Sequence, residues 1–167
     1  MEQIKLINIE NATEEEVAKY RVRQAARAIV FDEDGNIALL NATNNHYYKL
    51  PGGGIEEGED KEIALKRECK EEIGCDVEIV KEVGIIVEYR KNWGLKQTSY
   101  CYVAKVVGEK GEPTLEQSEI DEGFETVWLA INEALKKVKQ SKPVIYDGPY
   151  MVARDSAFLE KAKEILK

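Results

Sequence analysis

Three glutamates close together in the chain, Glu68, Glu71 and Glu72, have the spacing needed to act on one ligand. Residues at positions i, i+3 and i+4 share one face of an α-helix, so the three carboxylates would project together. Like charges on one face repel each other and weaken an isolated helix. A bound divalent cation would reverse that penalty, because Mg2+ accepts carboxylate oxygens. The spacing alone predicts either a metal site or a solvated charged face.

The composition limits which metal chemistry the chain can support. Its 167 residues include one histidine, His46, and three cysteines, Cys69, Cys75 and Cys101. A structural zinc site made of cysteine, or of cysteine and histidine, cannot be built from this inventory. Oxygen ligands and a hard ion such as Mg2+ or Mn2+ remain. We expect His46 to be a loop residue and the thiols to be reduced and at least partly buried.

The acidic balance of the chain excludes other partners. Asp and Glu number 32 against 24 Lys and Arg, which gives a formal net charge of −8. Non-specific binding to nucleic acid relies on clustered Lys and Arg, so we expect no polymeric nucleic acid partner. No apolar run reaches the roughly 20 residues that a membrane-spanning helix needs, and the first residues lack the apolar stretch of a secretory signal. We therefore expect a cytoplasmic protein with no membrane partner.

Periodicity and turn residues predict a single domain over residues 1–167, of the α+β class, with helices flanking a mixed sheet. The predicted strands are 4–10, 23–31, 37–41, 47–50, 77–90, 97–107 and 126–130. The predicted helices are 14–20, 60–73, 132–139 and 150–166. Gly74 ends the helix that carries the glutamates. Leu65, Cys69 and Ile73 form the apolar stripe that would anchor this helix to the sheet.

A run of glycines, Gly52, Gly53 and Gly54, precedes the glutamate helix. Glycines allow a tight turn and expose backbone groups to a ligand or a metal. The run is not a P-loop, because no Gly-Lys-Ser or Gly-Lys-Thr follows it. It is not a dinucleotide-binding fingerprint either, because Glu57 stands where the third glycine would be.

The residues around the glutamates resemble the Nudix box, the signature of Nudix hydrolases. The chain has Gly53, five residues, Glu59, seven residues and then Arg67-Glu68-Cys69-Lys70-Glu71-Glu72-Ile73-Gly74-Cys75, which matches all seven fixed positions. Cys69 and Cys75 stand where the family usually has aliphatic residues, and cysteine can serve as a small hydrophobe. The resemblance implies a Nudix-type α/β/α sandwich with a mixed sheet. It also implies hydrolysis, with Mg2+ or Mn2+, of the pyrophosphate bond in a nucleoside diphosphate linked to another group.

The resemblance implies a role for each position of the box. Glu68 and Glu72 match the central metal ligands, and Glu71 and the backbone carbonyl of Gly53 match further ligands. Arg67 matches the arginine that orients the neighbouring glutamates. We count Glu68, Glu71 and Arg67 among the catalytic residues as well. The cations would offset phosphate charge and lower the pKa of a bound water, which leaves the protein mainly positioning to supply.

Many Nudix hydrolases take another base or ligand from a loop before a late strand that contains tryptophan. Here Glu119, Asp121, Glu122 and Glu125 precede Trp128. Glu122 is the best placed by spacing and is our candidate; the alternative is an acidic, solvated loop. Within the box, Glu59 matches a structural glutamate that supports the ligands.

Further residues have two interpretations each. Arg23 and Arg27 share one side of a predicted strand, where they would meet substrate phosphate or, as we expect, form surface ion pairs. Tyr47, Tyr48 and Trp93 would stack on a base or, as we expect, pack against the protein.

The substrate class is the open part of the prediction. Relatives that act on ADP-ribose or on diadenosine polyphosphates often carry a marker Pro or Tyr beyond the box. The segment 87–91 has no Pro, and Tyr89 lies near the second marker at an imperfect offset. We expect an ordinary or oxidised nucleoside triphosphate. The alternatives are a non-catalytic nucleotide sensor and an acidic interaction surface for a basic protein. Many relatives form homodimers, so a homodimer is also an expectation.

Overall fold

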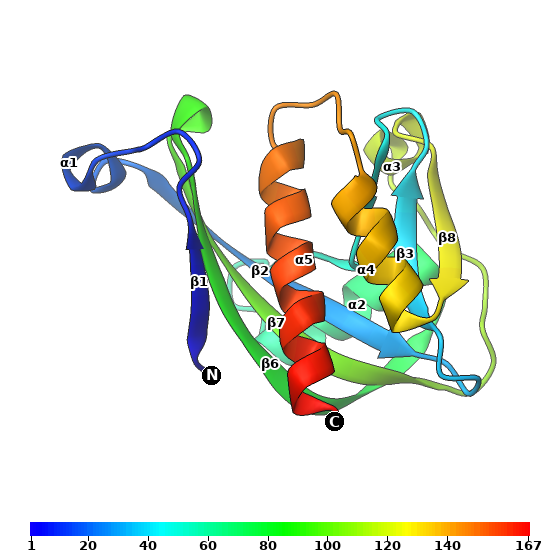
Figure 1. Ribbon diagram of the computed structural model, residues 1–167. Coiled ribbons are helices and arrows are strands. Elements are labelled where there is room, and N and C mark those ends of the chain that lie inside the picture. The colour runs from blue at the N-terminus through cyan, green and yellow to red at the C-terminus, as the bar shows by residue number, and fades with distance from the viewer.

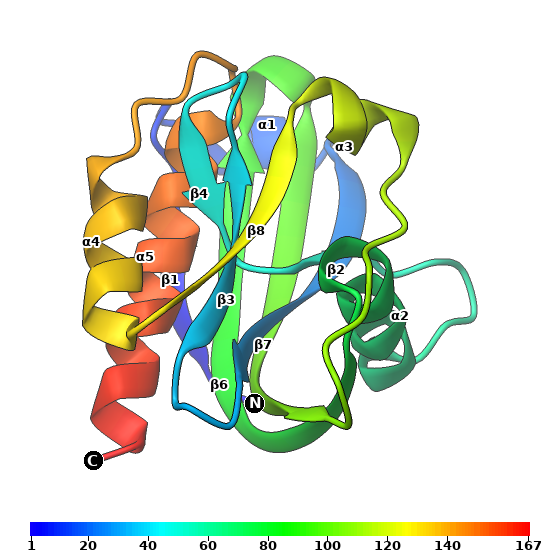
Figure 2. The same ribbon diagram turned by 90° about the vertical axis from the view of Figure 1, so that its right-hand side faces the viewer.

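Helices cover both faces of a mixed sheet in the computed structural model, which describes residues 1–167 (Figure 1). The strands are β1 (Gln3–Ile7), β2 (Arg21–Phe31), β3 (Ile37–Ala42), β4 (Tyr47–Lys49), β5 (Gly52–Gly54), β6 (Asp76–Arg90), β7 (Leu95–Val107) and β8 (Phe124–Leu129). The helices are α1 (Glu14–Val17), α2 (Lys61–Ile73), α3 (Gln117–Asp121), α4 (Ile131–Gln140) and α5 (Gly148–Ile165), with a short 3-10 helix η1 (Lys91–Trp93). Figure 2 shows α4 and α5 on one side of the sheet and α2 on the other, so the predicted α+β sandwich is confirmed. None of the helices is both long and apolar enough to cross a membrane.

Each face of the sheet has its own hydrophobic core, because side chains alternate along a strand. On β2, Ala28 and Val30 pack toward α2, whereas Ile29 packs toward α4 and α5. The predicted stripe of α2, which consists of Leu65, Cys69 and Ile73, is buried in the core between α2 and the sheet. All three cysteines are buried and unpaired, as expected. The two cores hold α2 and α5 in fixed positions on opposite faces of the sheet.

The sheet divides in its middle, between β2 and β3. Strand β2 pairs in parallel with β7 along its whole length but meets β3 only at Phe31 and Ile37. Beyond that point β5 pairs with β2 instead, with Ala25 opposite Gly54 and Arg27 opposite Gly52. Strand β3 pairs with β4 and β8. The divergence places the glycine strand β5 between the two halves of the sheet and next to α2.

Two elements, β5 and α3, differ from the sequence prediction. The glycines of β5 were expected to form a turn, since glycine has a low strand propensity, yet they pair with β2. Helix α3 has five residues, too few to display a helical period, and its start is fixed by a reciprocal capping box between Glu116 and Glu119. Both elements therefore depend on tertiary and capping contacts rather than on hydrophobic patterning.

Replacement of Gly52 tests the backbone geometry of β5. Gly52 has a φ of +133°, and a Cβ atom there would lie 2.1 Å from the carbonyl oxygen of Ala26. We expect Gly52→Ala to lower the free energy of unfolding by about 3 kcal/mol, because a strained φ is combined with overlap against backbone. Gly35→Ala is the matched control: its φ is +79° and no atom lies within 4 Å, so only the conformational cost of about 1 kcal/mol applies. Urea unfolding measures both, and equal losses would contradict the steric argument.

Candidate active site

The predicted site residues lie together in one cleft of about 680 Å³ between α2, β5, α5 and the α3–β8 segment. Those from the Nudix-like box are Gly53, Arg67, Glu68, Glu71 and Glu72, and Glu122 joins them from outside the box. Helix α2 is positioned at its start by the side chain of Asp60, which accepts a hydrogen bond from the amide of Glu62 at 2.8 Å. It ends at Gly74, which has the left-handed φ of +67°. These local signals and the buried stripe together set which face of α2 meets the cleft.

Glu72 is the most buried of the three glutamates, with 2% of its surface exposed. Its Oε2 accepts the backbone N–H of Gly52 at 2.7 Å, and its Oε1 accepts from Nζ of Lys49 at 3.2 Å. Burial raises the pKa of Glu72, and the charge of Lys49 and the Gly52 amide oppose that rise. Sequence reasoning did not single out Lys49, since nothing local to that residue indicates an ion pair with a helix that starts twelve residues later.

Glu68 lies one helical turn before Glu72 and faces Gly53. A Cβ atom at Gly53 would lie 2.5 Å from the carboxylate of Glu68, so a side chain at this position would displace that carboxylate. Burial and the charge of Glu72 raise the pKa of Glu68. The raised pKa reflects carboxylates that are close enough to repel each other in a poorly solvated place, a situation that a cation between them would relieve.

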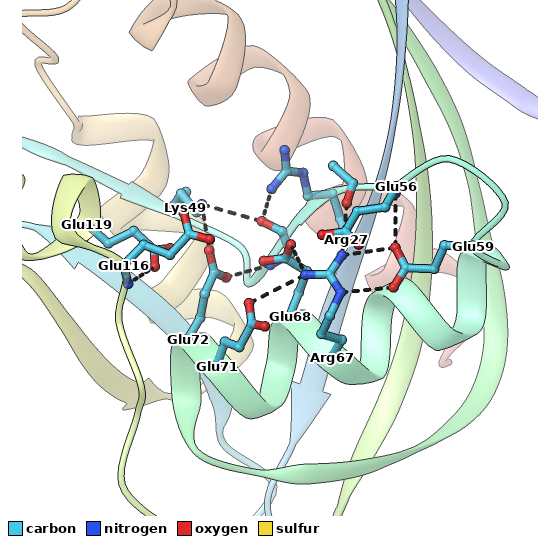
Figure 3. Close-up of polar contacts among 12 residues, drawn as sticks. Arg27, Lys49, Glu56, Glu59, Arg67, Glu68, Glu71, Glu72, Glu116 and Glu119 are labelled. Carbon is cyan, nitrogen blue, oxygen red and sulfur yellow. Dashed lines mark hydrogen bonds and ion pairs between the residues drawn. The ribbon is translucent and has the colours of Figure 1, made fainter.

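Arg67 connects the glutamates of the site (Figure 3). Its Nε and Nη2 contact the two oxygens of Glu59 at 2.8 and 3.0 Å, a bidentate geometry. Its Nη1 contacts Glu68 at 2.8 Å and Glu71 at 3.4 Å, and its Nη2 also donates to the carbonyl of Gly54 at 3.1 Å. The hydrogen bond from Arg67 lowers the pKa of Glu59 to about 2. Glu59 therefore stays ionised and holds Arg67 against the other two glutamates.

The donor set fits a hard divalent cation. Glu68, Glu71 and Glu72 offer only oxygen atoms, and the absence of a side chain at Gly53 lets the Glu68 carboxylate lie against that backbone within the cleft. In this structure no group of three or more Asp, Glu, Cys or His side chains is arranged so that it could hold a metal ion. Arg67 and Lys49 instead supply the positive charge that partners the carboxylates. A cation that bound here would take over part of that role.

The α3–β8 segment brings a second acidic wall to the cleft. Glu122 lines it, and its carboxylate accepts a hydrogen bond from the hydroxyl of Tyr47. Glu119 and Glu116 line it as well, and their charges act on Glu72 and Glu71 respectively. Glu125 is exposed and lies outside the cleft. The segment is thus not simply a solvated acidic loop, and Glu119 is an acid that spacing alone did not favour.

The expectation that the two arginines of β2 form surface ion pairs was wrong. Arg23 and Arg27 were expected to form surface ion pairs, but both line the cleft and neither is ion-paired. Arg27 is buried, because β2 is a central strand and its side chain points into the divided sheet beside Gly52. The alternation of residues on a strand predicts a shared face but does not reveal whether that face is covered.

The aromatic candidates separate into two groups. Trp93 is 45% exposed and lines the cleft next to Tyr146, at a ring-centroid distance of 4.9 Å. Tyr47 also lines the cleft, where it is buried, as the packing interpretation expects. Tyr48 packs against the core on the α4 side, and His46 is an exposed loop residue, as expected. Tyr89, the near match to a substrate marker, does not line the cleft.

Comparison with known proteins identifies a family and a shared fold. The NUDIX domain family model matches residues 21–148. An RNA pyrophosphohydrolase of Caulobacter vibrioides is 29% identical over 137 residues, which span 72% of this chain and 78% of that protein. Among solved structures, a NUDIX hydrolase from Nitrosomonas europaea has a TM-score of 0.64 at 18% identity, covering 86% of this chain and 90% of the other. The C. elegans Ap4A hydrolase has a TM-score of 0.60 at 21% identity, with coverage of 88% and 100%.

The structural likenesses show a shared fold, and the family match spans most of the chain, including every position of the box. The chain therefore belongs to the Nudix family, and it is a hydrolase that acts on pyrophosphate bonds.

Proposed function

We propose that the chain uses Mg2+ or Mn2+ to hydrolyse a nucleoside triphosphate or a related nucleotide at a pyrophosphate bond. The observation that supports this is the position of two carboxylates, the buried Glu72 and the partly buried Glu68, against the glycine strand β5 in a single cleft. Glu68, Glu71, Glu72 and the carbonyl of Gly53 would hold the cation. When bound, it offsets phosphate charge and lowers the pKa of a water ligand.

The residues of the chain then have defined tasks. Arg67 orients Glu68 and Glu71 through the contacts described above and is itself held by Glu59. Glu122 is our proposed base, and the hydrogen bond from Tyr47 fixes its carboxylate at the edge of the cleft. Glu119 is a second candidate for the base, because its charge acts on Glu72. An ionised carboxylate at either position would accept the proton of the attacking water.

The names of the relatives widen the range of substrates to test. One is an RNA pyrophosphohydrolase and one an Ap4A hydrolase. A 5′-triphosphate RNA and a free triphosphate nucleotide present the same reacting group. The net charge of −8 favours the smaller one, because a long polyanion would meet more repulsion. A cytoplasmic location and a homodimer stay predictions from the sequence. Because the chain is a Nudix hydrolase, we do not pursue the two non-catalytic alternatives, a nucleotide sensor and an acidic interaction surface.

A substrate panel tests the proposed substrate class. We expect Mg2+-dependent release of phosphate or pyrophosphate from a nucleoside triphosphate, measured beside a 5′-triphosphate RNA, a diadenosine tetraphosphate and ADP-ribose. The proposal fails if the triphosphate nucleotide is the poorest substrate of the four. Activity that persists in excess EDTA would contradict the role of the metal.

Substitution of Glu68 and Glu72 tests the proposed metal ligands. We expect Glu68→Gln and Glu72→Gln each to lower kcat by about 100-fold or more, because each loses a charged oxygen that stabilises the transition state through the cation. Glu62→Gln is the matched control, since Glu62 is exposed on the same helix and lies outside the cleft. Unchanged turnover in both glutamate variants, with the control also unchanged, would overturn the assignment.

Replacement of Lys49 tests the metal site without measuring activity. Lys49→Met leaves the Glu72 carboxylate buried without its cationic partner, and we expect it to lower stability by about 3 kcal/mol in EDTA. Added Mg2+ should raise the melting temperature of Lys49→Met more than that of the wild type, because the ion replaces the missing charge. Lys66→Met, at an exposed position of α2, is the control. The same Mg2+ shift in all three proteins would argue against a cation at Glu72.

A further inference from the structure

Two arginines of β2 face the cleft without an acidic partner. Arg27 is 5% exposed, yet its guanidinium group donates only to the carbonyl of Gly52, and its Nε has no partner at all. Arg23 donates to the side-chain oxygen of Gln97, which is uncharged. Neither forms an ion pair. A buried charge that lacks a counter-ion is costly, so its retention calls for an explanation.

The acidic groups near Arg23 and Arg27 are ion-paired with two other arginines, Arg90 and Arg154. Arg90 pairs with Glu88 at 2.9 Å and with Asp147 at 3.2 Å. Arg154 pairs with Asp155 at 2.7 Å and lies 3.6 Å from Glu88. Four guanidinium groups thus meet three carboxylates in this part of the molecule. One positive charge is therefore left over in this wall, and the two arginines on β2 are the ones without a direct ion pair.

The electrostatic environment of both side chains favours a bound anion. Burial and the charge of Arg154 lower the pKa of Arg27 to about 10, although the charges of Asp155 and Glu72 oppose that shift. Arg27 therefore remains charged at neutral pH. Burial and the charges of Arg90 and Arg154 lower the pKa of Arg23 as well. A guanidinium group presents a planar set of donors that matches the oxygens of a phosphoryl group.

The arginines and the glutamates meet at the same three-residue strand. Gly52 donates its N–H to Glu72 and receives a hydrogen bond from Arg27 on its carbonyl oxygen, which Lys49 also approaches at 3.5 Å. Two residues along, a Cβ atom at Gly54 would lie 3.0 Å from the guanidinium of Arg23. Residues along a strand advance about 3.3 Å each, so a chain of phosphates can reach both groups.

We propose that Arg23 and Arg27 form an anion subsite that binds a phosphoryl group of the substrate other than those held through the glutamates of α2. The assignment rests on the proposed function for the polyphosphate nature of the substrate. It selects substrates that carry negative charge beyond the reacting phosphates. A triphosphate group would be preferred over a diphosphate joined to an uncharged group.

Binding of inorganic triphosphate in EDTA tests the subsite without turnover. We expect calorimetry to show binding to the wild type and about 10-fold weaker binding to Arg23→Gln, the loss typical of one charged hydrogen-bond donor. Arg21→Gln is the matched control, because Arg21 is exposed on the same strand and lies outside the cleft. An equal loss in both variants would indicate only long-range charge and would overturn the proposal, as would no loss in Arg23→Gln.

Two more variants complete the test. Arg27→Lys keeps the charge but loses the planar donor set, and we expect weaker triphosphate binding with a melting temperature that shows a folded protein. Glu68→Gln should lose turnover but keep triphosphate binding, which separates this proposal from the catalytic one. With a triphosphate nucleotide as substrate, Arg23→Gln should raise KM about 10-fold and leave kcat within about twofold. An unchanged KM would reject the subsite even if hydrolysis is confirmed.

Discussion

The burial of the Glu72 carboxylate is the constraint on which the rest of the site depends. This side chain is almost fully removed from water, and it is stabilised there by the Gly52 amide and by Lys49. Because the carboxylate accepts a backbone N–H from β5, it fixes the distance and the rotation of α2 relative to that strand. Glu68, one turn earlier, is thereby brought against Gly53, where no side chain separates it from the cleft.

The segment from Leu50 to Gly54 is held from both faces of the sheet. On the α2 side it contacts Glu72 and, through the Gly54 carbonyl, Arg67. On the other side the amide of Leu50 donates to Oδ2 of Asp155 at 2.9 Å, and Asp155 is buried in α5. A short stretch of chain therefore joins two helices that pack on opposite faces. The division of the sheet between β2 and β3 makes this possible, because it leaves β5 accessible from both directions.

Local signals in the sequence were enough to predict the glutamate helix. The stop at Gly74 and the stripe that includes Leu65 are short-range features, and both lie where they were expected. The helix was predicted from residue 60, and Asp60 is its N-terminal cap. The spacing of the box also predicted which side chains share a face. The pairing of Lys49 with Glu72 was not predictable in this way, because it depends on where β4 lies relative to α2. The burial of Arg27 was missed for the same reason: strand alternation specifies a face, whereas burial depends on the division of the sheet and on α5.

The distribution of charge within the cleft explains how an acidic chain can bind an anionic substrate. Eight acidic and six basic side chains line the cleft, so its net charge is negative before any ion binds. The two kinds are largely segregated, because six of the eight acids lie on α2 or the α3–β8 segment. Four of the six basic groups lie toward α5 and β6: Arg23, Arg27, Arg90 and Arg154. A polyphosphate placed across β5 would be repelled at the acidic end unless divalent cations covered the glutamates, and it would be attracted at the basic end without them. The cleft would therefore bind the polyphosphate through divalent cations at its acidic end and through guanidinium groups at its basic end. This asymmetry gives the substrate a defined direction in the cleft.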